Sequence, residues 1–206
     1  MKKFKTIILA SVFFISFIIF TFVVKAELLN SFDFDTTVKL QDRIPRQYDS
    51  FLSFFSLVGS FEILAGFLFF VALFRKKILS FLIFAPLAAA HVIEIIGKTL
   101  MNHPGPPFLF FRYNLEFLFP SSYIQPGSSY PSGHSLRVVF VSIIIAYIVN
   151  KMKIKNLGKI IFNILLLAIN ITMLVSRVSL GEHWTTDVIG GILLGMSSGI
   201  FALIFL

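Results

Sequence analysis

The sequence contains no cysteine. This excludes a disulfide framework, a zinc site with cysteine ligands, an iron–sulfur cluster and a cysteine nucleophile. Charged residues are also scarce, at 14% of the 206 residues, whereas a soluble domain has roughly a quarter. Hydrophobic residues make up 57%, and the mean hydropathy is +0.90. These values exclude a disordered or collagen-like chain and nearly every soluble fold, and they predict a single membrane domain over 1–206.

Six apolar stretches are long enough, or nearly long enough, to cross a hydrocarbon core of roughly 30 Å, which takes about 20 residues. They lie at 7–24, 51–74, 78–96, 136–149, 160–175 and 188–206. The predicted fold class is therefore all-α, an integral membrane bundle of six transmembrane helices. The fourth and fifth stretches are short, and we expect them to extend into neighbouring polar motifs, where backbone can be buried in protein.

Segment 1–50 leaves two questions open. Three lysines precede the first apolar stretch, as in a signal peptide, but this stretch is longer than the apolar core of about 7–15 residues in such peptides. A retained helix is therefore expected. The polar part, 27–50, is either an interfacial helix or an exposed loop. We expect 1–50 to form a first span and an outer interfacial segment beside a core over 51–206.

Basic residues decide the expected orientation. They fill the segments 2–5, 75–77 and 151–159, none of which contains an acidic residue. With six spans these segments fall on one side of the membrane, which the positive-inside rule makes cytoplasmic. The N-terminus is then cytoplasmic, and the longer, more polar loops are extracytoplasmic. Topology thus explains much of the net charge of +8, and no nucleic-acid partner is expected. The short chain without organelle signals favours a bacterial inner membrane.

The polar segment 176–187 carries the clearest chemistry. Arg177 offers a planar fork of donors that suits phosphate oxygens. His183 and Asp187 are four residues apart, so they share one face if a helix begins there. A carboxylate bonded to one imidazole nitrogen leaves the other nitrogen free as a nucleophile or base. Alternatively, the pair is structural and only caps the helix.

A second polar segment, Ser132-Gly133-His134, precedes another apolar stretch. Backbone N–H groups at a helix start, with a glycine that permits close approach, form an anion site. Ser132 adds a hydroxyl donor. Beside a bound phosphate His134 would stay protonated and act as a general acid. The alternative is that His134 serves only as a helix cap.

A third group of polar residues lies near the end of the third apolar stretch. Lys98 is either a snorkelling lysine at the membrane interface or a positive charge for a phosphate. His91 and Glu94 lie one turn apart, and Lys98 lies one turn further along the same predicted helix. Ionisable residues within a membrane usually face the interior of a bundle. The three are therefore expected to form a buried polar network, either behind a site or only in helix packing.

Two of these segments resemble signature motifs of the type-2 phosphatidic-acid phosphatase superfamily, which also includes the soluble vanadium haloperoxidases. Pro131-Ser132-Gly133-His134 resembles the second motif. Ser176-Arg177-x5-His183-x3-Asp187 resembles the third, with its spacing complete. The resemblance covers about 60–206, which is essentially the whole expected core.

The resemblance implies a role for each matching residue. His183 is similar to the nucleophile that forms a phosphohistidine, Asp187 to its orienting carboxylate, and His134 to the acid that protonates the leaving oxygen. The residues similar to ligands of the phosphate oxygens are Lys98, Ser132, Gly133 and Arg177. No metal and no cofactor is implied, because cationic side chains neutralise the phosphate.

The first motif departs from the family pattern, in which a lysine is followed, after six residues, by Arg-Pro. Lys98 is in register, but Gly105 stands where the arginine belongs, and His103 takes the place of a less strict arginine. One phosphate ligand is therefore missing, a loss of about ten- to a hundred-fold in rate. Arg112, His103 or Arg137 could replace it, and Arg112, in the same outer loop, is favoured.

The resemblance implies a membrane phosphatase that hydrolyses a lipid phosphate or diphosphate at the extracytoplasmic face. Undecaprenyl diphosphate, phosphatidylglycerol phosphate and phosphatidic acid are all compatible with it. One alternative is a lipid phosphotransferase with the same intermediate. Another is a catalytically impaired lipid-phosphate binder, because of Gly105. The expected partners are thus the lipid phosphate and the membrane, and the sequence does not determine the oligomeric state.

Overall fold

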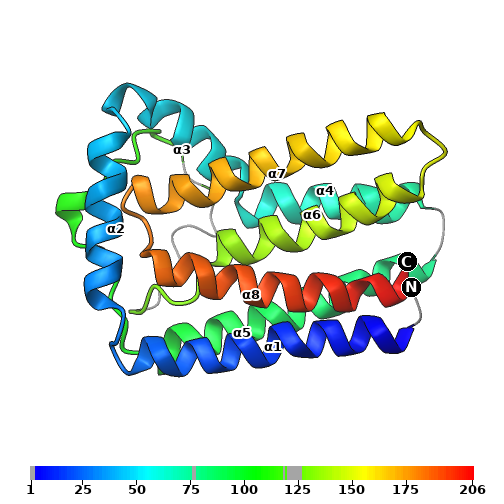
Figure 1. Ribbon diagram of the computed structural model, residues 1–206, viewed down its shortest axis with the longest axis horizontal. Coiled ribbons are helices and arrows are strands. Elements are labelled where there is room, and N and C mark those ends of the chain that lie inside the picture. The colour runs from blue at the N-terminus through cyan, green and yellow to red at the C-terminus, as the bar shows by residue number, and fades with distance from the viewer. Residues whose placement is uncertain (1–2, 76–77, 118, 120–126) are drawn as a thin grey trace.

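A computed structural model describes residues 3–75, 78–117, 119 and 127–206, and every regular element in these ranges is a helix (Figure 1). The α-helices are α1 (Lys3–Lys25), α2 (Asn30–Arg43), α3 (Asp49–Val58), α4 (Phe61–Phe74), α5 (Phe84–Leu100), α6 (Gly133–Lys151), α7 (Asn156–Ser179) and α8 (Thr185–Ala202). Short 3-10 turns are η1 (Arg46–Tyr48), η2 (Ile78–Ile83), η3 (Phe108–Phe110) and η5 (Leu203–Phe205). The all-α prediction is confirmed.

Five helical segments of the described chain are long and apolar enough to cross a membrane: Lys3–Lys25, Ser80–Leu100, Gly133–Lys151, Asn156–Ser179 and Thr185–Phe205. A sixth span is present if α3, with its preceding turn, and α4 count as one, although the two are bent by 50°. The predicted integral membrane bundle is thus confirmed. The stretch expected over 51–74 is therefore present as a broken span or as two shorter helices.

The break between α3 and α4 lies at Gly59 and Ser60, where α7 packs closely. A Cβ atom at Gly59 would lie 2.7 Å from the sulfur of Met173, so the end of that side chain would have to shift to accommodate a larger residue. Ser60 then adopts an extended conformation, with ψ of 157°, before α4 begins. The bend directs the end of α3 toward the end of α7.

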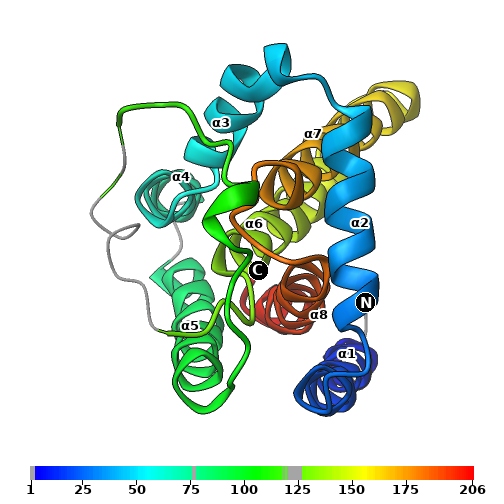
Figure 2. The same cartoon turned by 90° about the vertical axis from the view of Figure 1, so that its left-hand side faces the viewer.

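Helices α6 and α8 form the centre of the bundle, and the other long helices surround them (Figure 2). Glycines on α8 allow this contact. A Cβ atom at Gly195 would lie 2.5 Å from the carbonyl oxygen of Leu136, and one at Gly190 would lie 2.5 Å from the ring of Tyr130. Small residues let transmembrane helices approach closely, where van der Waals packing stabilises them.

Helix α1 packs along α8 and also reaches the second motif. The Ser197 hydroxyl on α8 donates to the carbonyl of Ala10 at 3.0 Å. The hydroxyls of Thr21 and Tyr130 are hydrogen-bonded at 2.9 Å, and the Phe17 ring stacks on Tyr130. The first span is therefore an integral part of the bundle in this structure.

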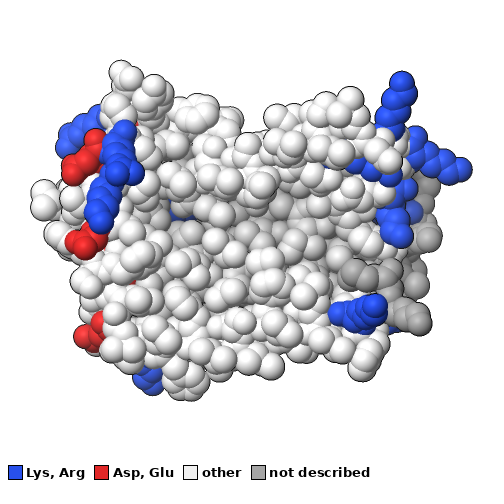
Figure 3. Space-filling model, viewed as in Figure 1, with Lys and Arg blue, Asp and Glu red and all other residues white. Residues whose placement is uncertain are grey.

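Helix α2 lies across one end of the bundle, roughly perpendicular to the long helices (Figure 1). Of the two alternatives for segment 27–50, the structure shows the helix. On the face shown in Figure 3, charged side chains gather at the two ends and leave an uncharged band between them. The end that bears α2 carries charges of both signs, whereas the opposite end carries Lys and Arg only. This distribution is that of an integral membrane protein.

Candidate active site

The three sequence motifs meet at the end of the bundle that α2 crosses. Helices α5 and α7 end there, and α6 and α8 begin there (Figure 1). The backbone N–H of Ser132 donates to the carbonyl of Asp187 at 3.0 Å, which joins the second motif to the third. The indole N–H of Trp184 donates to the carbonyl of Pro104 at 2.9 Å, which joins the third motif to the first.

His183 and Asp187 form the predicted pair. The Nδ1 atom of His183 lies 3.3 Å from Oδ2 of Asp187. The same carboxylate oxygen accepts from the backbone N–H of Trp184 at 2.9 Å, so Asp187 also caps α8. The short turn between α7 and α8 orients the histidine, since the N–H groups of Glu182 and His183 both donate to the carbonyl of Arg177. Among the described residues, no hydrogen bond engages the Nε2 atom of His183.

The environment of His183 keeps its imidazole neutral. Its side chain is buried, and burial lowers its pKa well below the ordinary value of 6.5. The positive charges of Arg177 and Lys98 lower it further, whereas Glu182 and Glu94 act in the opposite direction. A neutral imidazole with one nitrogen bonded to a carboxylate is the form in which histidine is a nucleophile.

His134, the second residue of α6, is brought to the same place. It interacts electrostatically with His183, Lys98 and Arg177. Ser132 is the N-cap of α6, and its hydroxyl oxygen accepts from the N–H of Ser135 at 3.5 Å. Two histidines that are far apart in the sequence therefore face one set of cationic groups at a helix N-terminus.

Carboxylates of the chain hold both predicted phosphate-binding cations. Lys98 Nζ lies 2.8 Å from Oε1 of Glu94. Arg177 Nη1 lies 2.6 Å from Oε2 of Glu182 and also donates to the hydroxyl of Ser56 on α3. These contacts fix the positions of two charges that lie close to His183.

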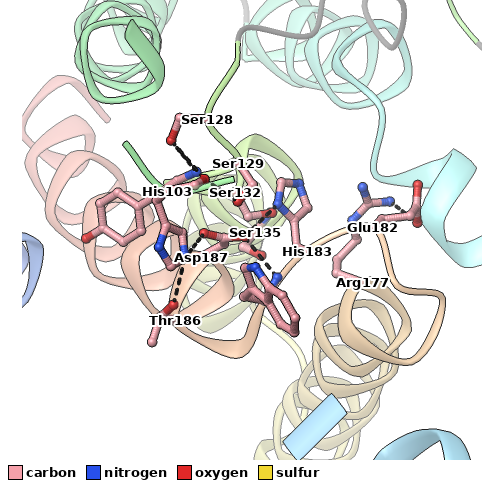
Figure 4. Close-up of polar contacts among 12 residues, drawn as sticks. His103, Ser128, Ser129, Ser132, Ser135, Arg177, Glu182, His183, Thr186 and Asp187 are labelled. Carbon is pink, nitrogen blue, oxygen red and sulfur yellow. Dashed lines mark hydrogen bonds and ion pairs between the residues drawn. The ribbon is translucent and has the colours of Figure 1, made fainter. Parts of the chain in front are cut away.

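His103 is placed behind Asp187. Its Nε2 atom lies 3.3 Å from Oδ1 of Asp187 and 3.4 Å from the hydroxyl of Thr186. Thr186 in turn donates from its N–H and its hydroxyl to Asp33 of α2, at 2.8 and 2.6 Å. Figure 4 shows Asp187 between the two imidazoles. The contacts of His103 are thus with the orienting carboxylate, which does not support the prediction that it binds phosphate.

Arg112 also has other partners, which does not support the prediction that it replaces the missing arginine. Its Nε and Nη2 atoms form a bidentate pair with Asp49, at 3.0 and 2.7 Å. Its remaining contacts are with the carbonyls of Gln41 and Ile44, at 3.2 and 3.1 Å. A guanidinium held in this way ties the α2–α3 connection to the outer loop, so the structure does not bring Arg112 to the phosphate ligands.

Two residues of this region carried no sequence signal. Ser56 lies within an apolar stretch, and Asp33 lies in a segment of mixed charge, so neither belongs to a motif. Only the packing of α3 on α7 and of α2 on α8 brings them to Arg177 and Thr186. Within the described ranges, no group of three or more His, Asp or Glu side chains is arranged to hold a metal ion.

Comparison with known proteins adds three findings. The model of the PAP2 superfamily matches residues 78–206. A transmembrane PAP2 type phosphatidylglycerolphosphate phosphatase from Bacillus subtilis superposes with a TM-score of 0.75 at 21% identity, covering 95% of this chain and 94% of that one. LpxE from Aquifex aeolicus superposes with a TM-score of 0.63 at 21% identity, covering 84% and 95%. Among curated protein sequences no significant match was found.

Proposed function

This chain belongs to the PAP2 superfamily, and on that premise we propose that it is a membrane phosphatase that hydrolyses a lipid phosphate or diphosphate. One observation carries the proposal. A buried His183–Asp187 pair and His134 come together with Lys98 and Arg177 at one end of the bundle. A nucleophile, an acid and two cations are the groups that phosphoryl transfer requires.

The reaction begins with attack by His183 on phosphorus. Nε2 of His183 forms the P–N bond as the bond from phosphorus to the lipid oxygen breaks, and His134 protonates that oxygen. Asp187 accepts the hydrogen bond from Nδ1 and stabilises the developing positive charge on the ring. A water molecule then attacks phosphorus and gives a proton to His134, the P–N bond breaks, and inorganic phosphate and the neutral imidazole of His183 are released.

Lys98, Arg177, Ser132 and the N–H of Gly133 bind the oxygens that do not leave. The N-terminus of α6 adds favourable electrostatics for an anion. Glu94 and Glu182 hold the two cations in position, so little reorganisation is needed when a phosphate arrives. Because these charges are fixed by the protein itself, the chain's own residues neutralise the transferred group.

The substrate is proposed to be an amphiphile whose tail stays among the helices. Most of the exposed side chains between the two charged ends are apolar, so a hydrocarbon tail has a compatible environment beside the bundle. Undecaprenyl diphosphate, phosphatidylglycerol phosphate and phosphatidic acid each combine such a tail with a phosphate ester or anhydride. The phosphatidylglycerolphosphate phosphatase from Bacillus subtilis, which shares this fold, makes the second an obvious first choice for testing.

The site is proposed to face the extracytoplasmic side of a bacterial inner membrane, with the N-terminus in the cytoplasm. The charge distribution supports this orientation. The end opposite the site carries Lys and Arg without acidic residues on the face shown in Figure 3, which is typical of a cytoplasmic end. The site itself, under α2, belongs to the end with charges of both signs. The whole chain, 1–206, is proposed to act as one membrane domain.

The test is phosphate release by the purified protein from the three candidate lipids in mixed micelles. Since His183 forms the covalent intermediate, His183→Ala should lower kcat/KM by at least about a thousand-fold. Thr172→Ala is the control, because that exposed hydroxyl bonds only to its own helix, at Ala168, among the described residues. Unchanged activity in His183→Ala would contradict the mechanism. Binding of these lipids without any turnover by the unaltered protein would instead support the impaired binder.

A further inference from the structure

We propose that Arg137 of α6 supplies the phosphate-binding charge that the first motif lacks at Gly105. The inference rests on the proposed phosphatase function and adds a substrate-binding residue to it. In the motif pattern this phosphate-binding charge comes from the outer loop, whereas here we assign it to a helix in the core of the bundle. Three observations carry it: the space at Gly105, the commitments of the competing side chains, and the position of Arg137.

Packing does not require a glycine at position 105. A Cβ atom there would meet the side chain of Ser129 at 3.5 Å, which is an ordinary van der Waals contact. Gly105 also lacks a positive φ that would disfavour other residues. The arginine is thus missing although its place could hold a side chain. A positive charge supplied from another element would make an arginine there unnecessary.

The competing cations have other partners. Arg112 is bound by the carboxylate of Asp49 and by two carbonyl groups at the α2–α3 connection. His103 contacts Asp187 and Thr186. Neither side chain is placed to approach a phosphate bound between His134 and His183.

Arg137 lies one turn after His134 on α6, and its side chain is buried at the site. Its Nη2 atom is 3.4 Å from Nδ1 of His134, and its Nε atom is 3.5 Å from the carbonyl of Gly59. A guanidinium only donates hydrogen bonds, so Nδ1 of His134 must be the acceptor. The neutral ring then carries its proton on Nε2, and it must gain a second proton before it can act as the general acid toward a leaving oxygen.

Glu94 places Arg137 beside Lys98. Its Oε1 atom binds Lys98 at 2.8 Å, and its Oε2 atom lies 4.0 Å from Nη1 of Arg137. Glu62 adds a further negative charge near the guanidinium. The Glu94 carboxylate also lies against the first turn of α6, because a Cβ atom at Gly133 would be 2.2 Å from Oε1. Glu94 therefore acts as a positioning residue that holds two cations at the proposed anion site.

The ligand class is a phosphate monoester or diphosphate group, and Arg137 would bind one of its equatorial oxygens. In this arrangement Lys98 and Arg137 share the carboxylate of Glu94, which lies against the first turn of α6, and Arg177 extends from the last turn of α7. Three cations around one tetrahedral group restore the number that the family pattern provides. The positive charge absent at Gly105 would then be supplied by Arg137 on α6, and catalysis would not be impaired.

The test compares Arg137→Gln, Gly105→Arg and the double variant with the unaltered protein. Arg137→Gln should lower kcat/KM for the preferred lipid by about ten- to a hundred-fold, as for loss of a charged hydrogen bond. The double variant should recover at least about tenfold of that loss, because the arginine at position 105 returns the charge to its motif position. Arg43→Gln on the exposed surface of α2 is the matched control and should remain within twofold.

Calorimetric titration with orthovanadate, a phosphate analogue, provides a readout that needs no turnover. Arg137→Gln should weaken vanadate binding by about tenfold or more, and the double variant should restore it. A kcat/KM and a vanadate affinity within threefold of the unaltered protein would overturn the proposal. The proposal would also be overturned if Arg137→Gln lowered both kcat/KM and the vanadate affinity and Gly105→Arg restored neither. A purely structural role of Arg137 would give that result.

The two proposals fail separately. If the unaltered protein releases no phosphate, the phosphatase function is contradicted, while vanadate binding still decides the role of Arg137. If His183→Ala abolishes activity and Arg137→Gln does not lower it, the phosphatase function stands and the role of Arg137 falls.

Discussion

Asp187 contacts an imidazole with each of its carboxylate oxygens, and this bridging explains several features of the site. Oδ2 lies near His183, and Oδ1 lies near His103. Beyond His103, Thr186 connects the same carboxylate to Asp33 on α2. Oδ2 carries the hydrogen bonds, whereas Oδ1 accepts none from the described residues. The bond to Oδ2 restricts the rotamer of His183, so fewer conformations have to be excluded when a phosphate binds. Asp33 is itself buried, and desolvation raises its pKa above 3.8.

The lowered pKa of His183 makes a pH prediction at the scale of a single residue. Because the folded-state pKa lies below 6.5, the ring stays neutral and nucleophilic as the pH falls through 6.5. The acid limb of the kcat/KM profile reports groups of the free enzyme. We therefore expect that limb to have its midpoint below pH 6.5, measured by phosphate release at constant ionic strength. A midpoint at 7 or above would show that the buried cations do not act on the nucleophile as described.

At the scale of elements, the turn between α7 and α8 positions His183, the proposed nucleophile. Gly181 has a φ of +68°, and a Cβ atom there would lie 2.1 Å from the carbonyl oxygen of Phe110. That carbonyl also accepts from the side chain of Gln41 on α2 at 2.6 Å, and the same amide donates to Ser179 at 3.0 Å. The turn, the outer loop and α2 are thus fastened together directly beside Arg177 and His183.

Gly181→Ala is accordingly expected to destabilise the protein. The left-handed conformation and the clash with Phe110 should each cost about 1 kcal/mol or more, which lowers the apparent melting temperature in detergent by several degrees. Gly158→Ala is the matched control, since Gly158 lies in α7 and no atom within 4 Å would meet a Cβ there. Alanine is the better helix former, so the control should be neutral or slightly stabilising. Equal melting temperatures for the two variants would contradict this account of the turn.

At the scale of the whole molecule, the two ends of the bundle differ in charge and in function. The motifs, α2 and most of the polar contacts lie at one end, and the basic turns lie at the other (Figures 1 and 3). Embedding the apolar band in a bilayer leaves each end in its own aqueous compartment. An enzyme of this shape would act on phosphate groups presented at one membrane surface only.

The orientation can be tested directly because the chain contains no cysteine, so single cysteines can be introduced into an unlabelled background. Asp42→Cys on α2 and Lys155→Cys before α7 both lie at exposed positions, at opposite ends of the bundle. With a membrane-impermeant maleimide, Asp42→Cys should be labelled in intact spheroplasts and Lys155→Cys only after permeabilisation. The reverse pattern would place the site on the cytoplasmic side.

The sequence by itself determined the class of protein and the identity of the motif residues. Hydropathy predicted the apolar stretches, because a chain segment must satisfy its own backbone within the membrane, and that requirement is local. The His183–Asp187 pair was likewise predictable from its spacing of four residues, although His183 lies in the turn before α8 and Asp187 in the first turn of that helix. In each case the informative residues are neighbours in the sequence.

Only the tertiary structure decided which of two arginines, Arg112 or Arg137, lies beside the site. The sequence favoured Arg112 over Arg137, but Asp49 binds the first, and the second lies beside His134 and Glu94. Gly59, at the break, likewise packs against Met173, from a helix more than a hundred residues away. A guanidinium takes the partners that folding brings to it, and contacts between distant segments leave no periodicity or spacing in the sequence. For this physical reason the motifs could be predicted from the sequence, whereas the arginine that lies beside His134 could not.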